Sequence, residues 1–166
     1  MNEELELKLV KKYPVIFQDY KGDYRKTCMA WGFSCGDGWY KIIDNLCQDI
    51  ETKIGKKDIQ FIAVQVKEKF GALRFYYHIN HTPSFLAEIG NNIRNFFYNH
   101  GWGVVYNKFR HIRKIFFKST IEKISDIVES AEMKSYKTCE ICGNDGKKRK
   151  GNWIRVRCDK CEEEKK

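Results

Sequence analysis

The sequence predicts an α+β fold in which helices pack on a β-hairpin or small antiparallel sheet, with a zinc ribbon at the C-terminus. Two neighbouring segments, residues 59–67 and 73–77, alternate apolar and polar side chains and are separated by a short turn, as in a β-hairpin. The segments before and after them carry apolar residues at helical spacing. Near the C-terminus, two Cys-x2-Cys pairs stand fifteen residues apart, which is typical of a four-cysteine zinc site.

The composition narrows the class of protein. With 166 residues, of which 42% are hydrophobic, the chain is long enough to bury a core, and its net charge of +9 favours a polyanion or an acidic protein surface as partner. It has no run of about 18 apolar residues, so we expect no membrane span. The first residues, Met1–Glu6, are acidic and polar, unlike a secretory signal peptide, and we therefore expect an intracellular protein with reduced thiols.

The first half of the chain predicts two helices separated by a loop and a short strand. A short helix is expected over residues 3–12, and a short strand over residues 26–33. The sequence Cys-Gly-Asp-Gly-Trp at 35–39 then introduces a longer helix that ends at Gly55, with Asp37 as its N-cap.

The predicted hairpin follows this helix. A strand over 59–67 leads through a turn at 67–71, whose charges are expected to be exposed, into a strand over 73–77. On the returning strand the apolar side chains share one face, which we expect to pack on the preceding helix. These residues are Leu73, Phe75 and Tyr77, while Arg74 and Tyr76 lie on the other face.

A second helical region begins at an N-cap, Thr82. Its apolar stripe breaks at residues 100–103 and changes face at a capping box that starts at Ser119. The pattern therefore predicts either one kinked helix or two helices over residues 104–132.

The four-cysteine pattern predicts one structural Zn²⁺. The expected ligands are Cys139, Cys142, Cys158 and Cys161. Four thiolates complete a tetrahedron and leave no position for water, so a catalytic zinc is not expected. We divide the chain into an α+β domain over residues 1–133 and a zinc ribbon over residues 134–166, which should unfold from about residue 137 onward without its metal.

The other three cysteines leave alternatives open. Cys28 and Cys35 could form a second metal site with His78 and His81, although neither spacing is that of a known zinc knuckle; otherwise they are strand or loop thiols. Cys47 is expected in the core. A reactive Cys35 thiol, its pKa lowered at a helix N-terminus, is a further alternative, but no histidine or second cysteine is placed beside it.

A basic and aromatic helical segment, residues 91–118, is the first candidate binding surface. No acid lies between Glu88 and Glu122, and cations that could neutralise phosphates alternate with aromatic rings that could stack on unpaired bases. The ordinary alternative is a solvated helix face. The candidate residues are Arg94, Trp102, Lys108, Arg110, Arg113, Lys114 and Lys118.

The ribbon offers a second candidate surface. Trp153 lies on one face of a short predicted strand together with two arginines, and a run of four basic residues precedes that strand. Trp153 is either exposed for binding or packed on the main domain. The candidate residues are Lys147, Lys148, Arg149, Lys150, Trp153, Arg155 and Arg157.

Enzyme motifs are weak or missing. Asp58, Gln65 and Lys67 only weakly match the acid…Gln-x-Lys pattern of metal-dependent nucleases. No histidine has the metal-binding acid beside it that a histidine-dependent nuclease needs, and P-loop, nucleophile-elbow and dinucleotide motifs are missing. We therefore expect a non-enzymatic protein, with a metal-dependent nuclease as the alternative.

Several separate segments resemble a group of small, mostly uncharacterised zinc-ribbon proteins of bacteriophages and prophages. They are Cys-Gly-Asp-Gly-Trp at 35–39, Val-Lys-Glu-Lys-Phe-Gly at 66–71, Leu-Arg-Phe-Tyr at 73–76, and Cys-Glu-x-Cys-Gly at 139–143 before the second pair of cysteines. The resemblance covers most of the chain and implies a phage or mobile element acting in the cytoplasm of a bacterial host. The basic segment at 91–118 departs from it, being longer and more aromatic.

These observations together predict a non-enzymatic, zinc-stabilised binding protein of a phage or mobile element. Its partner would be nucleic acid or a host protein–nucleic acid machine, and inhibition of a host defence system is one form of this function. A protein adaptor without affinity for nucleic acid is the remaining alternative. The oligomeric state does not follow from the sequence.

Overall fold

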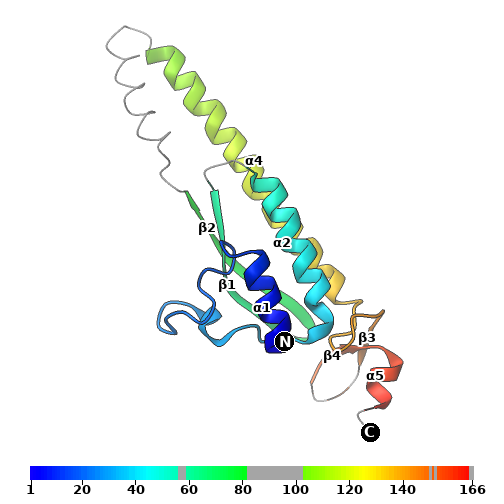
Figure 1. Cartoon of the computed structure of the whole chain (residues 1–166). Coiled ribbons are helices and arrows are strands. Elements are labelled where there is room, and N and C mark those ends of the chain that lie inside the picture. Colours follow the sequence, from blue (N-terminus) through cyan, green and yellow to red (C-terminus); the bar gives the residue numbers. More distant parts are fainter. Residues whose placement is uncertain (56–58, 82–102, 150, 152, 165–166) are drawn as a thin grey trace.

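The computed structural model describes residues 1–55, 59–81, 103–149, 151 and 153–164; of His81 and residues 103–118 it describes the backbone only. The described chain is α+β, as predicted, and Figure 1 labels its helices and strands. They are α1 (Glu3–Lys12), η1 (Cys28–Trp31), η2 (Asp37–Trp39), α2 (Tyr40–Ile54), β1 (Ile59–Lys69), β2 (Ala72–His81), α4 (Gly103–Ser135), β3 (Lys147–Arg149), β4 (Arg155–Arg157) and α5 (Asp159–Glu163).

Strands β1 and β2 form the predicted antiparallel hairpin. Its turn is shorter than predicted, because Lys69 still pairs with Ala72 and only Phe70 and Gly71 lie between the strands. Both turn residues have positive φ, 55° and 76°, as the common two-residue hairpin turn requires. A bulge between Ala63 and Gln65 shifts the register once along the hairpin.

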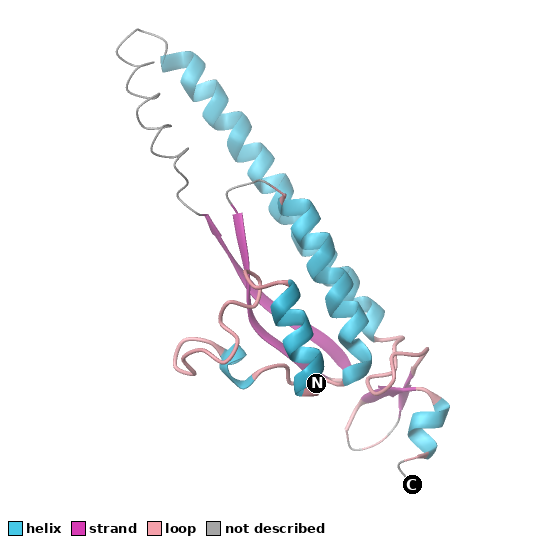
Figure 2. Ribbon diagram, in the orientation of Figure 1, coloured by secondary structure: helices cyan, strands magenta, loops and turns pink. Residues whose placement is uncertain are grey.

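Helices α1, α2 and α4 enclose the core with the inner face of the hairpin. Figure 2 shows α2 lying beside the C-terminal half of α4, with the two strands crossing behind α1. The predicted apolar stripes supply most of this core. Its buried residues include Leu9, Tyr13, Trp39, Ile43, Leu46 and Ile50 from the first half of the chain, Phe61, Val66, Leu73 and Phe75 from the hairpin, and Ile124, Val128 and Ala131 from α4.

Helix α4 is continuous, which decides between the one-helix and two-helix alternatives. It runs from Gly103 to Ser135, so Ser119 lies inside the helix and does not start a new one. Its C-terminal end is fixed to β2, because Ser135 Oγ accepts a hydrogen bond from Leu73 N at 2.8 Å and Glu132 Oε1 accepts one from Phe75 N at 2.9 Å. Among the described residues, no helix is long and apolar enough to cross a bilayer.

Two local predictions in the first half of the chain are wrong. Residues 26–33 contain a 3₁₀ helix, η1, instead of a strand, because the Thr27 side chain accepts a hydrogen bond from Met29 N and starts a helical turn. Asp37 does not cap α2. Its carboxylate instead accepts hydrogen bonds from Asn2 N at 2.6 Å and Asn2 Nδ2 at 2.8 Å, and so fixes the start of α1.

A half-buried charge cluster joins α1 to α2. The Asp44 carboxylate accepts hydrogen bonds from Lys12 Nζ at 2.6 Å and Tyr13 Oη at 2.8 Å. Burial alone would raise the pKa of the Asp44 carboxyl, but these two hydrogen bonds outweigh burial and place it below its usual value.

Replacing Asp44 with asparagine should therefore destabilise the protein at neutral pH and much less in acid. Because the folded-state pKa lies below that of the unfolded chain, the carboxylate stabilises the fold above the unfolded pKa of about 4, and this contribution disappears as pH falls through the folded pKa. Urea unfolding of the wild type and of Asp44→Asn at pH 7 and at pH 3 measures the difference. An equal difference at the two pH values would contradict the assignment.

Candidate metal centre and basic aromatic surface

The four predicted ligand cysteines come together in the C-terminal segment. The Sγ atoms of Cys139, Cys142, Cys158 and Cys161 all lie within 4.8 Å of one another. Cys139 and Cys142 belong to a tight turn that is closed by a 3.0 Å hydrogen bond from Gly143 N to Cys139 O, and Gly143 has a φ of 78° that favours glycine. At the second pair, Cys158 Sγ accepts a hydrogen bond from Cys161 N at the start of α5.

The geometry of this four-cysteine cluster fits a metal ion. A tetrahedron of thiolates about 2.3 Å from its metal has S–S edges of about 3.8 Å, and the Cys142 and Cys158 sulfurs lie 3.6 Å apart. Burial would raise the pKa of the Cys139 thiol, but backbone hydrogen bonds from Cys142, Cys158 and Ile141 lower it to about 7, whereas hydrogen bonds with the Cys158 and Cys142 sulfurs raise the pKa of the Cys161 thiol. The cluster can therefore hold a metal ion.

A buried ion pair connects the strands of the ribbon with the first cysteine pair. The Arg157 guanidinium lies 3.0 Å from Glu140 Oε1 and 3.6 Å from Glu162 Oε2, and only 4% of the Arg157 side chain is exposed. Arg157 thus supports the ribbon from inside. The prediction that it belongs to an exposed binding face with Trp153 is wrong.

The motif at 35–39 is the surface on which the first cysteine pair rests. Gly38 N donates a hydrogen bond to Glu140 O at 3.0 Å, and a Cβ on Gly38 would overlap the Cys139 carbonyl oxygen. The fully buried Trp39 donates from its indole Nε1 to Thr138 O at 3.0 Å. The glycines are therefore required by close contact between backbones, and the ribbon is docked on the main domain.

The remaining thiols do not form a metal group with each other among the described side chains. Cys28 and His78 are exposed, Cys35 and Cys47 are buried, and the side chain of His81 lies outside the described residues. Burial raises the pKa of the Cys35 thiol to about 12, which is opposite to the alternative of a reactive thiol with lowered pKa.

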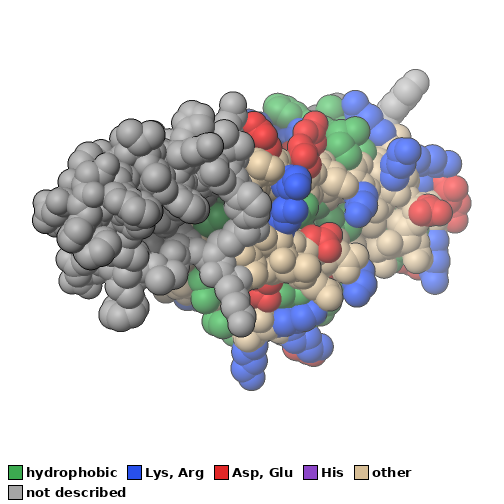
Figure 3. All heavy atoms as spheres, turned by 90° about the horizontal axis from the view of Figure 1, so that it is seen from above, with side chains coloured by type: hydrophobic (Ala, Val, Ile, Leu, Met, Phe, Trp, Pro, Cys, Tyr) green, Lys and Arg blue, Asp and Glu red, His purple; other side chains and the backbone are tan. Residues whose placement is uncertain are grey.

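The structure describes only some side chains of the predicted basic residues, and those it describes differ in exposure and in ion pairing. Arg94, Trp102 and Lys150 lie outside the described residues, and the side chains of Lys108, Arg110, Arg113, Lys114 and Lys118 on α4 are not described. In the ribbon, Lys147 and Arg149 both pair with Asp159 at 2.8 Å, whereas Lys148 is exposed and Arg155 is half-buried. Figure 3 shows that Lys and Arg side chains are interspersed with acidic ones on the described part of one face.

Trp153 lies where the ribbon meets the hairpin turn. It is partly packed on the main domain and partly exposed, so each of the two alternatives for it holds in part. Its indole Nε1 donates to Glu68 Oε2 at 3.3 Å, yet 63% of the residue is exposed. Glu68 Oε1 in turn accepts a hydrogen bond from Gly71 N at 2.6 Å and so supports the turn. Ile154 also packs closely on Gly71.

A cleft opens between Trp153 and the turn residue Phe70, which is 66% exposed. We call it the hairpin–ribbon cleft. Its volume is about 540 Å³, and it is lined by Lys67, Glu68, Lys69, Phe70, Trp153 and Ile154. The Lys69 ammonium lies 5.4 Å from the centre of the Phe70 ring, and that of Lys67 lies 5.2 Å from the centre of the Tyr76 ring on the outer face of the hairpin.

Phe70 and Tyr76 were not among the site residues predicted from the sequence. The signal was present, because a two-residue hairpin turn prefers Asn or Gly at its first position and this chain has phenylalanine there. The predicted turn was too long to reveal it.

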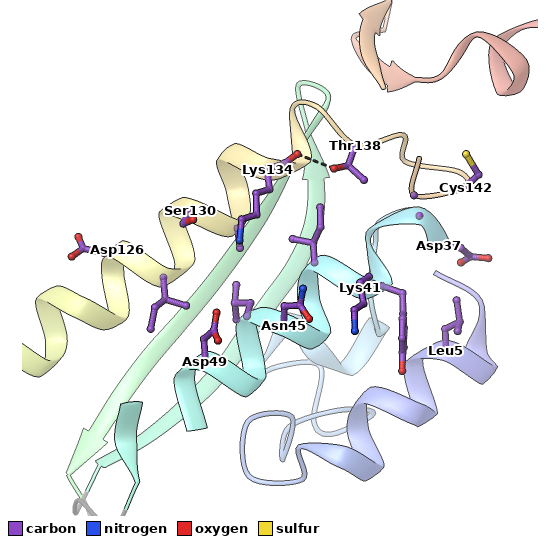
Figure 4. A pocket seen from close by; sticks show the side chains of 17 residues that line it. Leu5, Asp37, Lys41, Asn45, Asp49, Asp126, Ser130, Lys134, Thr138 and Cys142 are labelled. Carbon is purple, nitrogen blue, oxygen red and sulfur yellow. Dashed lines mark hydrogen bonds between the residues drawn. The ribbon is translucent and has the colours of Figure 1, made fainter. Parts of the chain in front are cut away.

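A second hollow lies between α2 and α4 beside Cys142. It has a volume of about 630 Å³, and Figure 4 shows acidic and basic side chains on its walls. The charged residues are Asp37, Lys41, Asp49, Asp126 and Lys134. Its three carboxylates outnumber its two lysines, whereas the hairpin–ribbon cleft has two lysines and one carboxylate, so this hollow favours a polyanion less than that cleft does.

Comparison with protein-family models, with curated proteins and with solved structures found no match for this chain. The likeness to phage zinc-ribbon proteins that its motifs suggest therefore stays a prediction.

Proposed function

We propose that this protein is a non-enzymatic nucleic-acid-binding protein, stabilised by one structural Zn²⁺, whose hairpin–ribbon cleft takes an unpaired base. The observation that carries the proposal is the cleft itself, in which two exposed aromatic rings from distant parts of the chain stand beside two lysines. Aromatic rings stack on bases of any sequence, and lysines neutralise the neighbouring phosphates.

Zinc is the metal that the four-cysteine cluster favours. Four thiolates in a tetrahedral arrangement select soft ions such as Zn²⁺, and they leave no open position for a water or a substrate. A site of this kind supports a structural role, and its docking on the motif at 35–39 supports the same role.

The conformation of Phe70 supports a binding role for its side chain. A residue other than glycine at a φ of 55° costs about 1 kcal/mol or more, and the exposed ring gains little from packing. Asparagine or glycine would make the same turn with less strain. Retaining phenylalanine at this position is favourable if the ring contacts a partner.

The two lysines of the cleft are placed to contact phosphates. Neither Lys67 nor Lys69 forms an ion pair with any residue that the structure describes, and Glu68 between them already accepts hydrogen bonds from Gly71 and Trp153. The net charge of +9 adds a general attraction for polyanions.

Replacing Trp153 or Phe70 with alanine should weaken binding of single-stranded nucleic acid about five- to a hundred-fold. The range follows from about 1 to nearly 3 kcal/mol for each stacked base. Fluorescence anisotropy with labelled DNA and RNA at two salt concentrations measures the effect. Met133→Ala is a matched control, because Met133 is a similarly exposed apolar residue at 59% on α4.

The same assay separates the alternatives. If the wild-type protein binds neither DNA nor RNA at low salt, the protein-adaptor alternative is favoured. Cleavage with Mg²⁺ or Mn²⁺ that Lys67→Ala abolishes would favour a nuclease. In a phage or mobile element, as the motifs imply, the proposed activity would serve to engage nucleic acid or a host protein–nucleic acid machine, including one used in defence.

A further inference from the structure

An exposed aromatic pair lies on the loop between α1 and α2, apart from the hairpin–ribbon cleft. Trp31 is 73% exposed and Tyr24 is 64% exposed, and their ring centres are 6.3 Å apart at an angle of 52°. Neither Tyr24 nor Trp31 was among the predicted binding residues. Two large rings in water gain little from each other compared with what each would gain by stacking on a further planar group.

Cations accompany this pair. The Arg25 guanidinium lies 5.7 Å from the centre of the Tyr24 ring, and the Lys21 ammonium lies 5.5 Å from that of Tyr20. Counting residues 19–32, the loop has three basic residues, Lys21, Arg25 and Lys26, against two acids, Asp19 and Asp23. The loop thus resembles the cleft in having exposed rings and a small excess of positive charge, although Arg25 also lies 3.9 Å from Asp23.

The loop is fixed against the same strand that leads to the cleft. Thr27 Oγ1 donates to Val64 O at 3.3 Å, and further along Ser34 N donates to Val66 O at 2.9 Å. The segment therefore lies against the edge of β1 that does not pair with β2, and Figure 1 shows the loop on the side of the hairpin near β1. Hydrogen bonds within it, such as Lys21 N to Met29 O at 3.2 Å, hold the rings in place before any partner arrives.

We propose that Tyr24 and Trp31 form a second contact for the same single strand that enters the hairpin–ribbon cleft. This inference rests on the proposed function. Val64, whose carbonyl accepts the hydrogen bond from Thr27, precedes Phe70 by six positions. That is roughly 20 Å of extended chain, or about six nucleotides of a stacked single strand. An oligonucleotide of four nucleotides can then occupy one contact only, whereas one of sixteen can occupy both. For the longer strand, binding at the second contact is intramolecular and therefore raises the overall affinity.

The test compares the affinities of a four-nucleotide and a sixteen-nucleotide oligonucleotide for the full-length, metal-loaded protein. A longer strand offers more positions at which one contact can bind, and this alone raises its apparent affinity. In the wild type the sixteen-nucleotide strand should bind at least about tenfold more tightly than this statistical effect predicts. In Trp31→Ala this excess should disappear, and Trp31→Phe should restore most of it. Because Trp31 is a surface residue, the variants should remain folded, which circular dichroism checks.

Ultraviolet crosslinking of the sixteen-nucleotide strand gives a second measurement that needs no variant. Crosslinked peptides should come from both the loop and the cleft. If Trp31→Ala keeps the excess affinity and crosslinks map to the cleft alone, the second contact is wrong while the proposed function stands. If no oligonucleotide of either length binds the wild type, both fail together.

Discussion

Replacing Gly38 with alanine is expected to destabilise the whole protein by about 3 kcal/mol or more and to weaken its affinity for metal. The added Cβ would overlap the Cys139 carbonyl oxygen and come within 2.5 Å of Gly143 N, and both are backbone atoms of the turn that carries two ligands. Backbone cannot rotate away as a flexible side chain can. The variant must therefore either shift the cysteine pair or separate the ribbon from α2.

Two measurements test this prediction. Chemical denaturation gives the loss in free energy of unfolding, and competition with a chromophoric chelator gives the metal affinity. Gly151→Ala is the matched control, because among the described residues a Cβ there comes no closer than 3.9 Å to any atom. If Gly38→Ala were as stable and bound metal as tightly as Gly151→Ala, the docking of the ribbon on the 35–39 motif would be refuted.

Removing the metal is expected to have the other large effect. The ribbon consists of short strands and one five-residue helix, and it has little core of its own. Binding of a structural zinc ion contributes on the order of 10 kcal/mol to a module of this kind. After chelation, residues from about 137 onward should lose their structure.

The docking contacts predict that this effect spreads beyond the ribbon. Hydrogen exchange followed by mass spectrometry, with and without chelator, should show faster exchange at the backbone amide of Gly38, whose partner is Glu140 O. The neighbouring amide of Trp39 should exchange faster as well, because the Trp39 indole loses its partner Thr138 O and no longer holds this turn. It should also show faster exchange at the turn around Gly71, which Ile154 covers. Amides in the middle of α2, such as that of Leu46, serve as the internal control and should change least. Faster exchange confined to the ribbon would mean that the two parts are energetically independent.

Much of the fold was predictable from local patterns. The spacing of apolar residues indicated the helices around Leu9, Leu46 and Ile124, and alternation indicated the hairpin. These signals are strong because burial of one face repeats with the period of the element. The short 3₁₀ helix η1 was assigned wrongly, since four residues are too few to establish a period and the cap at Thr27 decides.

The candidate site was less predictable. The cysteine spacing identified the ligands, because zinc coordination constrains residues that are close in sequence. Arg157 was misplaced, because its alternation with Val156 indicates two faces but does not tell which partner covers each. Phe70 and Trp153 are 83 positions apart in sequence, and no local pattern relates them.

The sequence by itself determined the α+β elements and the four-cysteine cluster, because periodicity and ligand spacing are properties of short stretches of chain. Only the tertiary structure decided what the glycines of the 35–39 motif are for, and where Trp153 points. The reason is that docking depends on backbone approach between segments about a hundred residues apart: Gly38 has no Cβ so that the cysteine pair at Cys139 can lie against it. The same approach brings the ribbon to the hairpin turn, where it forms one wall of the hairpin–ribbon cleft.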